Sequence, residues 1–317
     1  MSDLSYYAFL SGFVVSSVAA VAYLVTAVGT WTAYRPAATN AGTLSIPVTV
    51  TLPNGAGRFA RVSLYLALAL LTASVAFRAV AVGRPPVGNL WEYTVALSWG
   101  IVFFTTVFEA RFNERSIPAV MLPGAVIMMS VALLFFPSGV QPLVPALQSN
   151  RILGLHVTTV MLAYSALSIS FGASVLYLLQ VSGPSRAIAA GELPSAGSGV
   201  SPAASAGRRF PRLPDAESLG EVAYWSVLVG FPLLTLGIAL GAYWANNAWG
   251  RYWGWDPKET SALLTWFVYA GYLHARGLRG WEGKRAAYLL LIGYGAVLFT
   301  YFAVNFLISG LHSYAGV

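Results

Sequence analysis

The chain has 317 residues, of which 57% are hydrophobic and only 9% are charged, with a formal net charge of +7. Its mean hydropathy of +0.67 excludes a soluble globular domain. The basic residues lie scattered between apolar runs and form no patch with interleaved aromatic residues, which argues against nucleic acid as a partner.

Runs of apolar residues follow one another along the chain, and each is long enough for a helix to cross a bilayer about 30 Å thick. We therefore predict an all-α, polytopic transmembrane bundle of about eight spans. In chain order the predicted spans are 5–29, 62–82, 91–110, 117–136, 152–181, 221–245, 259–277 and 286–309. The first run carries Asp3 where a signal peptide has basic residues, and it is too long for a signal peptide's apolar core, so we count it as a span.

One segment divides this series. Residues 183–219 are rich in Gly, Pro, Ser and Ala and cannot bury enough apolar surface to offset the entropy of ordering. We predict a flexible cytoplasmic linker there, between a five-span part at 1–182 and a three-span part at 220–317. A shorter stretch, 41–57, is compatible with a hairpin that turns near Asn54.

The distribution of basic residues predicts the orientation. If the N-terminus lies outside, thirteen basic residues fall in cytoplasmic loops and only four in outer loops, namely Arg84, Arg151, Arg251 and Lys258. The positive-inside rule therefore places both termini on the outer face.

Two helix starts carry recognisable caps. In both Asn89-Leu90-Trp91-Glu92 and Asp256-Pro257-Lys258-Glu259, an Asx residue at the N-cap is followed by Glu at the third helical position. This pattern gives Asp256 a structural role at the start of the seventh span. Glu109 and Glu114, beside Arg111 and Arg115, are typical of ordinary solvated charges.

Chemistry-bearing residues are few. The chain has no cysteine, which excludes disulfides and thiolate sites, and it has no nucleophilic triad or phosphate-binding loop. Its three histidines are His156 and His312 at outer span ends and His274 within the seventh span, roughly 22 Å below the outer rim. A single histidine at a helix end is commonly a satisfied polar residue, but two neutral imidazoles on one face could bind a metal axially.

Tryptophan is concentrated in the same region. The segment WGRYWGWDPKET, residues 249–260, follows Trp244 and contains Trp249, Trp253 and Trp255. An interfacial aromatic belt explains one or two of these, but not four interrupted by glycines. A flat apolar ligand such as haem, covered by indoles and held by His156 and His312, accounts for the pattern.

The segment WGRYWGWDPKETSALLTWFVYAGYLHAR (249–276) resembles the tryptophan-rich WWD signature of haem-handling proteins. Within that superfamily it is most similar to the CcsA (ResC) family of System II cytochrome c biogenesis. The resemblance continues in PVGNLWEY (86–93), LVPALQSNRILGLHV (143–157) and VNFLISGLHSYAG (304–316).

The resemblance implies sites for haem b. It implies that His156 and His312 bind haem iron at an outer site, and that His274 binds it at an inner site during transit. The haem-contacting stretch is 249–256, with Trp249, Trp253, Trp255 and Asp256.

The resemblance also implies an enzymatic role, as the CcsA component of a holocytochrome c synthase that attaches haem to CxxCH motifs of apocytochrome c. The implied partners are a CcsB (ResB)-like membrane protein, apocytochrome c and a thioredoxin-like thiol reductant. The implied location is the bacterial cytoplasmic membrane, or the thylakoid membrane for a plastid-encoded chain. We assign no catalytic acid or base. The alternatives are a haem carrier without synthase activity, like the CcmC or CcmF groups, and a b-type membrane cytochrome.

Overall fold

A computed structural model describes residues 1–32, 54–140, 151–181, 214–278, 281–308 and 310. Within these ranges every regular element is helical. The main helices are α1 (Ser2–Thr32), α2 (Asn54–Val82), α3 (Leu90–Phe112), α4 (Ser116–Phe135), α5 (Arg151–Val181), α8 (Ala216–Trp249), α9 (Pro257–Arg276) and α10 (Lys284–Leu298). A π-helical turn, η2 (Phe299–Ala303), and a short α11 (Val304–Phe306) continue α10.

The predicted fold class is confirmed, because each predicted span overlaps one helix. In the described ranges, seven helical segments are long and apolar enough to cross a membrane, so the chain is a polytopic membrane protein. The remaining long helix, α9, matches the predicted span 259–277 but is more polar. The predicted caps also form: Asn89 accepts a hydrogen bond from the Glu92 amide at 2.8 Å, and Asp256 opens α9 with a capping box.

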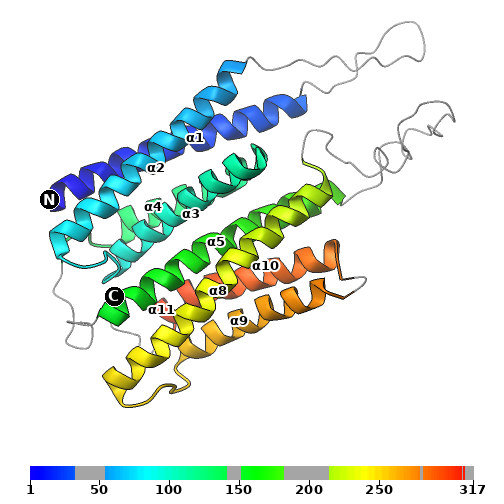
Figure 1. The fold of residues 1–317 in the computed structure, drawn as a ribbon. Coiled ribbons are helices and arrows are strands. Elements are labelled where there is room, and N and C mark those ends of the chain that lie inside the picture. Colours follow the sequence, from blue (N-terminus) through cyan, green and yellow to red (C-terminus); the bar gives the residue numbers. More distant parts are fainter. Residues whose placement is uncertain (33–53, 141–150, 182–213, 279–280, 309, 311–317) are drawn as a thin grey trace, which may run out of the picture.

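The helices lie side by side (Figure 1). The α1–α2 hairpin packs on α4 and α3, α5 contacts α3, α4, α8 and α10, and α9 packs on α10 and α8. The start of α1 and the short helix α11 lie at the same end of the bundle (Figure 1). We call it the tryptophan end, because it also carries the α8–α9 connection at 250–256. The location of the tryptophan end on the outer face of the membrane stays a prediction.

Small residues let α5 and α8 approach closely. A Cβ atom added at Gly230 would lie 2.6 Å from Leu167, and one added at Gly237 would lie 2.6 Å from Val160. Close backbone approach through glycine is a common way for membrane helices to associate without a hydrophobic driving force. This contact fixes the start of α5 against the end of α8.

Two predictions about connecting segments fall largely outside the described residues. The hairpin expected at 41–57 is one of them, and its turn is wrong, because Asn54 and Gly55 begin α2. The predicted linker at 183–219 is the other. Its last residues are helical, since α8 begins at Ala216 with Asp215 as its N-cap.

The solvated environment expected for Glu109 is also wrong. Its side chain is fully buried, and the Arg61 Nε atom donates a hydrogen bond to its Oε1 atom at 3.0 Å. The α1–α2 hairpin packs over this part of α3 and brings Arg61 to the carboxylate. Glu109 therefore belongs to the packing of the N-terminal helices, at the end of the bundle opposite the tryptophans.

Candidate functional site

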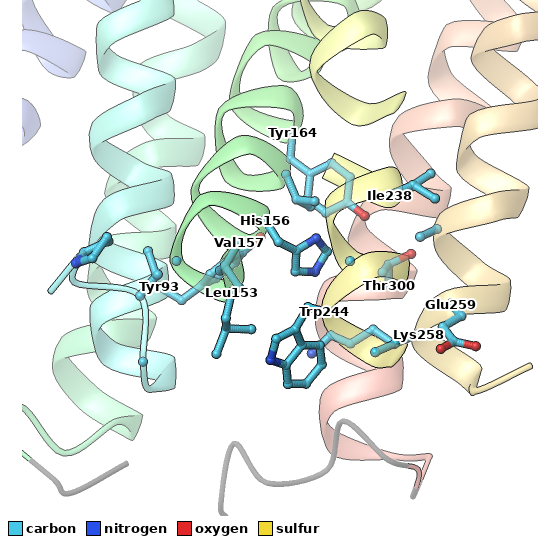
Figure 2. A pocket seen from close by; sticks show the side chains of 18 of the residues that line it. Tyr93, Leu153, His156, Val157, Tyr164, Ile238, Trp244, Lys258, Glu259 and Thr300 are labelled. Atoms are coloured by element: carbon cyan, nitrogen blue, oxygen red, sulfur yellow. The ribbon is translucent and has the colours of Figure 1, made fainter. Parts of the chain in front are cut away.

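A cavity of about 740 Å³ lies at the tryptophan end. It is bordered by the α2–α3 turn, the first turns of α5, the last turns of α8, the start of α9 and η2 (Figure 2). Its volume is in the range of sites for small organic ligands, and aliphatic and aromatic side chains make up most of its wall. Helices that are distant in the sequence therefore build one site.

His156 projects into this cavity from the second turn of α5 (Figure 2). Its Nδ1 atom lies 2.6 Å from the carbonyl oxygen of Gly237 on α8. A carbonyl oxygen can only accept, so Nδ1 carries a proton, and when the ring is neutral its lone pair lies on Nε2. A Cβ atom added at Gly241 would lie 2.5 Å from His156 Cε1. The helix α8 thus both orients the imidazole and leaves room for it.

The four tryptophans divide into two pairs. Trp244 is buried at the end of α8 and lines the cavity, and Trp249 meets it edge-to-face with ring centroids 4.8 Å apart. Trp253 also lines the cavity, and Trp255 contacts it edge-to-face at 5.8 Å. Trp249 and Trp255 do not line the cavity, and Trp255 is 69% exposed. The structure therefore brings Trp244 and Trp253 to His156 and places the other two behind them.

Asp256 is buried between the aromatic loop and α9. Its carboxylate accepts a hydrogen bond from the Lys258 amide at 3.1 Å. The Glu259 carboxylate reaches back to the amides of Gly254 and Asp256, at 2.8 Å and 3.1 Å. These bonds hold the loop that carries Trp253 in one conformation.

His312 lies outside the described residues, so its meeting with His156 stays a prediction. Gly310, two residues earlier, is described. A Cβ atom added at Gly310 would lie 2.5 Å from the Asp256 carboxylate oxygen and 3.0 Å from Pro257. Gly310 thus lies at the tryptophan end, beside the start of α9.

His274 is not part of this cavity. It is exposed in the last turn of α9, roughly 26 Å along the helix axis from Pro257 at 1.5 Å per residue. Leu264 and Phe267, 56% and 58% exposed, lie on the same face of α9. The chain therefore has an imidazole at each end of the membrane-spanning region.

Sequence reasoning missed the floor of the cavity, which is built by the π-helical turn. Thr300 and Tyr301 of η2 line the cavity, and Tyr301 stacks on Tyr93 with ring centroids 5.7 Å apart. The Tyr301 hydroxyl also bonds to Thr94. A π-turn inserts a residue into a helix and is frequent at functional sites. No sequence pattern predicted it here.

Lys258 is a second residue that sequence reasoning missed. Its side chain enters the wall of the cavity, and Nζ donates a hydrogen bond to the Asn305 side-chain oxygen at 2.6 Å. Burial lowers the pKa of Lys258 to about 8, and the nearby Asp256 carboxylate partly opposes this shift. From the sequence, Lys258 was assigned to the helix cap that begins at Asp256 and was counted among the charges of the outer loops.

A buried ion cluster holds the α2–α3 turn beside the cavity. Arg78 and Arg84 donate to the two carboxylate oxygens of Glu92 at 3.0 Å and 2.8 Å. The Gly88 amide donates to Glu92 as well, at 2.9 Å. The cap motif predicted that Glu92 lies in the first turn of a helix, but it did not predict this ion cluster.

Comparisons with known proteins place the chain among related sequences. Residues 87–312 match the family described as cytochrome C assembly protein. The chain is 40% identical to the cytochrome c biogenesis protein CcsA of Guillardia theta over 256 residues, which cover 80% of this chain and 84% of that one. It is also 40% identical to the CcsA protein of Synechococcus sp. (strain JA-3-3Ab) over 283 residues, which cover 78% and 81% of the two chains.

Among solved structures, the cytochrome c heme lyase CcmF shares the fold. The TM-score is 0.62 at 16% sequence identity, and the match covers 95% of this chain. It covers only 46% of that lyase, so the chain spans less than half the length of the lyase.

Proposed function

Because the chain belongs to the CcsA family of cytochrome c assembly proteins and so acts in cytochrome c biogenesis, we propose that it is the haem-handling component of a holocytochrome c synthase. It receives haem b from the cytoplasmic side, holds it in the cavity at the tryptophan end, and presents it to the CxxCH motif of apocytochrome c. One observation carries the proposal: the oriented imidazole of His156 projects into an apolar cavity beneath the aromatic loop.

The residues around the cavity fit haem as a substrate. His156 offers Nε2 as the metal-binding atom, Trp244 and Trp253 supply flat apolar surfaces, and the volume of about 740 Å³ suits a large organic ligand. The second axial ligand is His312. Two residues of chain span at most about 7 Å, so the position of Gly310 beside Asp256 supports an approach of His312 to this end of the bundle.

The proposed reaction adds two thiols to two vinyl groups. In each addition the S–H bond breaks, a C–S bond forms at one vinyl carbon and a C–H bond forms at the other, so no oxidant or leaving group is needed. The contribution of this chain is to hold haem and peptide together so that a bimolecular addition becomes effectively unimolecular. The thiols must be reduced, and since this chain has no cysteine, a thioredoxin-like partner supplies that reduction.

A CcsB-like partner completes the inner site. His274 is exposed in the last turn of α9, and it shares this exposed face with Leu264 and Phe267. We propose that the partner covers this face of α9 and supplies the second ligand of haem at His274. The tryptophan end then faces the outside of a bacterial cytoplasmic membrane, or the lumen in a thylakoid membrane.

The test is co-expression of this chain with a CcsB-like protein and a CxxCH reporter. We expect covalent haem on the reporter with the native chain, and little or none with His156→Ala. Haem bound to this chain without transfer to the reporter would identify a carrier instead. If the His156→Ala complex contains as much haem as the native complex, with the same spectrum, haem does not bind in this cavity.

A further inference from the structure

Three cationic side chains line the cavity, and they differ in their partners. Arg84 is paired with Glu92 at 2.8 Å. Arg151 begins α5 and is exposed, so water solvates it. Lys258 is set into the wall, where the Nζ atom donates to the neutral amide oxygen of Asn305 at 2.6 Å. Among the described residues of the wall, Lys258 is therefore the one cation that is partly buried and has no paired carboxylate.

No carboxylate lies within ion-pairing distance of Lys258 Nζ in the part of the chain that the structure describes. Asp256 acts on the ammonium through space and offsets its charge only in part. A partly buried ammonium group without a paired carboxylate costs free energy. The first turn of α9 adds positive potential from the helix dipole. This part of the wall is therefore complementary to an anion.

We propose that Lys258, oriented by Asn305, binds a carboxylate group of the ligand in the cavity. This inference rests on the proposed function, in which the ligand is haem and the carboxylate is a propionate. Lys258 and His156 stand on different walls of one cavity, on α9 and α5 (Figure 2). A ligand with a metal at its centre and carboxylates at one edge can meet both.

The pairing also orients the ligand. In haem b the two propionates lie on one half of the macrocycle and the two vinyl groups on the other. With the propionate edge at Lys258 on α9, the vinyl half turns toward the opposite wall, which the α2–α3 turn forms. Lys258 thus selects which edge of haem meets apocytochrome c. In this role Lys258 binds the carboxylate and transfers no proton.

The test compares haem with its dimethyl ester, which lacks both negative charges. Each is titrated by absorbance into the purified native complex and into complexes carrying Lys258→Met, Lys258→Arg or Lys284→Met. Lys284, the other lysine of the chain, is exposed and serves as the control. We expect the native complex to bind haem about tenfold or more tightly than the ester. We expect Lys258→Met to bind both equally, Lys258→Arg to keep part of the preference, and Lys284→Met to keep all of it.

A native complex that does not distinguish haem from the ester would overturn the proposal, and this result involves no variant that could misfold. Unchanged preference in Lys258→Met would overturn it as well. A failure of the proposed function would give a different result. The His156→Ala complex would then bind haem with the native affinity and spectrum, whatever preference the Lys258→Met complex shows.

Discussion

The Nδ1 atom of His156 and the carbonyl oxygen of Gly237 meet at 2.6 Å across the interface of α5 and α8. The bond fixes the tautomer and the rotation of the ring, and the proposed function assigns the other nitrogen, Nε2, to the haem iron. The same helix places Trp244 on the cavity wall. The spacing of α5 and α8 therefore sets the positions of both His156 and Trp244.

Gly241→Ala should weaken haem binding, because its Cβ atom would lie 2.5 Å from His156 Cε1 and push the ring from its position. We expect haem content to fall several-fold and the absorption maximum to shift, with little change in melting temperature. The control is Gly271→Ala on α9, where an added Cβ atom meets nothing within 4 Å. Native haem content in Gly241→Ala would show that the ring position is not critical.

Asp256 should act mainly as a helix cap. Asn can accept the same hydrogen bond from the Lys258 amide, so Asp256→Asn should be mild, whereas Asp256→Ala should cost about 1 kcal/mol and loosen the loop of Trp253. Thermal melting and haem content of both variants measure this difference. Equal haem loss in the two variants would indicate a direct role for the carboxylate instead.

Glu92→Gln should destabilise the protein by about 3–5 kcal/mol, because it leaves the buried Arg78 without its counter-charge. The α2–α3 turn should loosen, and haem affinity should fall with it, since Arg84 and Gly88 lose their partner. Thermal melting in detergent checks the first effect and haem titration checks the second. The matched control is Glu282→Gln, at an exposed position. A Glu92→Gln protein as stable as that control would contradict the role of the cluster.

The helices and their caps could be predicted because their signals are local. Apolar length sets each span, and Asn89 and Asp256 cap the helices that directly follow them. The environment of Glu109 could not be predicted in this way. It depends on Arg61, which lies 48 residues earlier and is brought close only by packing of the α1–α2 hairpin.

The residues of the cavity could also be predicted only in part. His156 and Trp253 were predicted from residue type, since histidines are rare here and tryptophans cluster. Tyr301 was missed because it lies on a π-turn, which has no recognised sequence pattern, and Asn305 was missed because it directly follows that turn. Lys258 was missed because its partner, Asn305, lies 47 residues away.

His274→Ala should lower the haem content of the cavity at the tryptophan end although the residues of that cavity stay intact. The reason is that haem from the cytoplasm would lose its inner ligand, while His156, at the other end of the bundle, is unchanged. The measurement is haem content of the complex purified without added haem. His274→Ala complex loaded afterwards with free haem should regain native occupancy. The control is Thr260→Val, on the same exposed face of α9 but near the tryptophan end. Full occupancy in His274→Ala without added haem would mean that haem arrives by another route.

The final prediction concerns pH. Because burial lowers the pKa of Lys258 to about 8, its ammonium loses its proton at a pH where an exposed lysine keeps it. Only the ammonium attracts a carboxylate, so haem affinity should be highest below pH 8 and fall as the pH rises through 8, by at most about tenfold per unit. The bound carboxylate stabilises the ammonium and so raises the pKa of Lys258 in the complex. Haem affinity should therefore fall from about pH 8 up to the pH at which the bound ammonium also loses its proton.

Other charged or titratable groups also surround the cavity. They are His156, Arg84, Arg151, Asp256, Glu259, Tyr93, Tyr164, Tyr252 and Tyr301. Lys258→Met leaves all of them in place, so it separates their effect on haem affinity from that of Lys258. Titrating haem at pH 7, 8 and 9 into the native and Lys258→Met complexes tests the prediction, and the dimethyl ester corrects for pH effects on the iron. The native complex should lose affinity for haem but not for the ester, and Lys258→Met should show no such difference. An equal decline in both complexes would assign the pH dependence to another group.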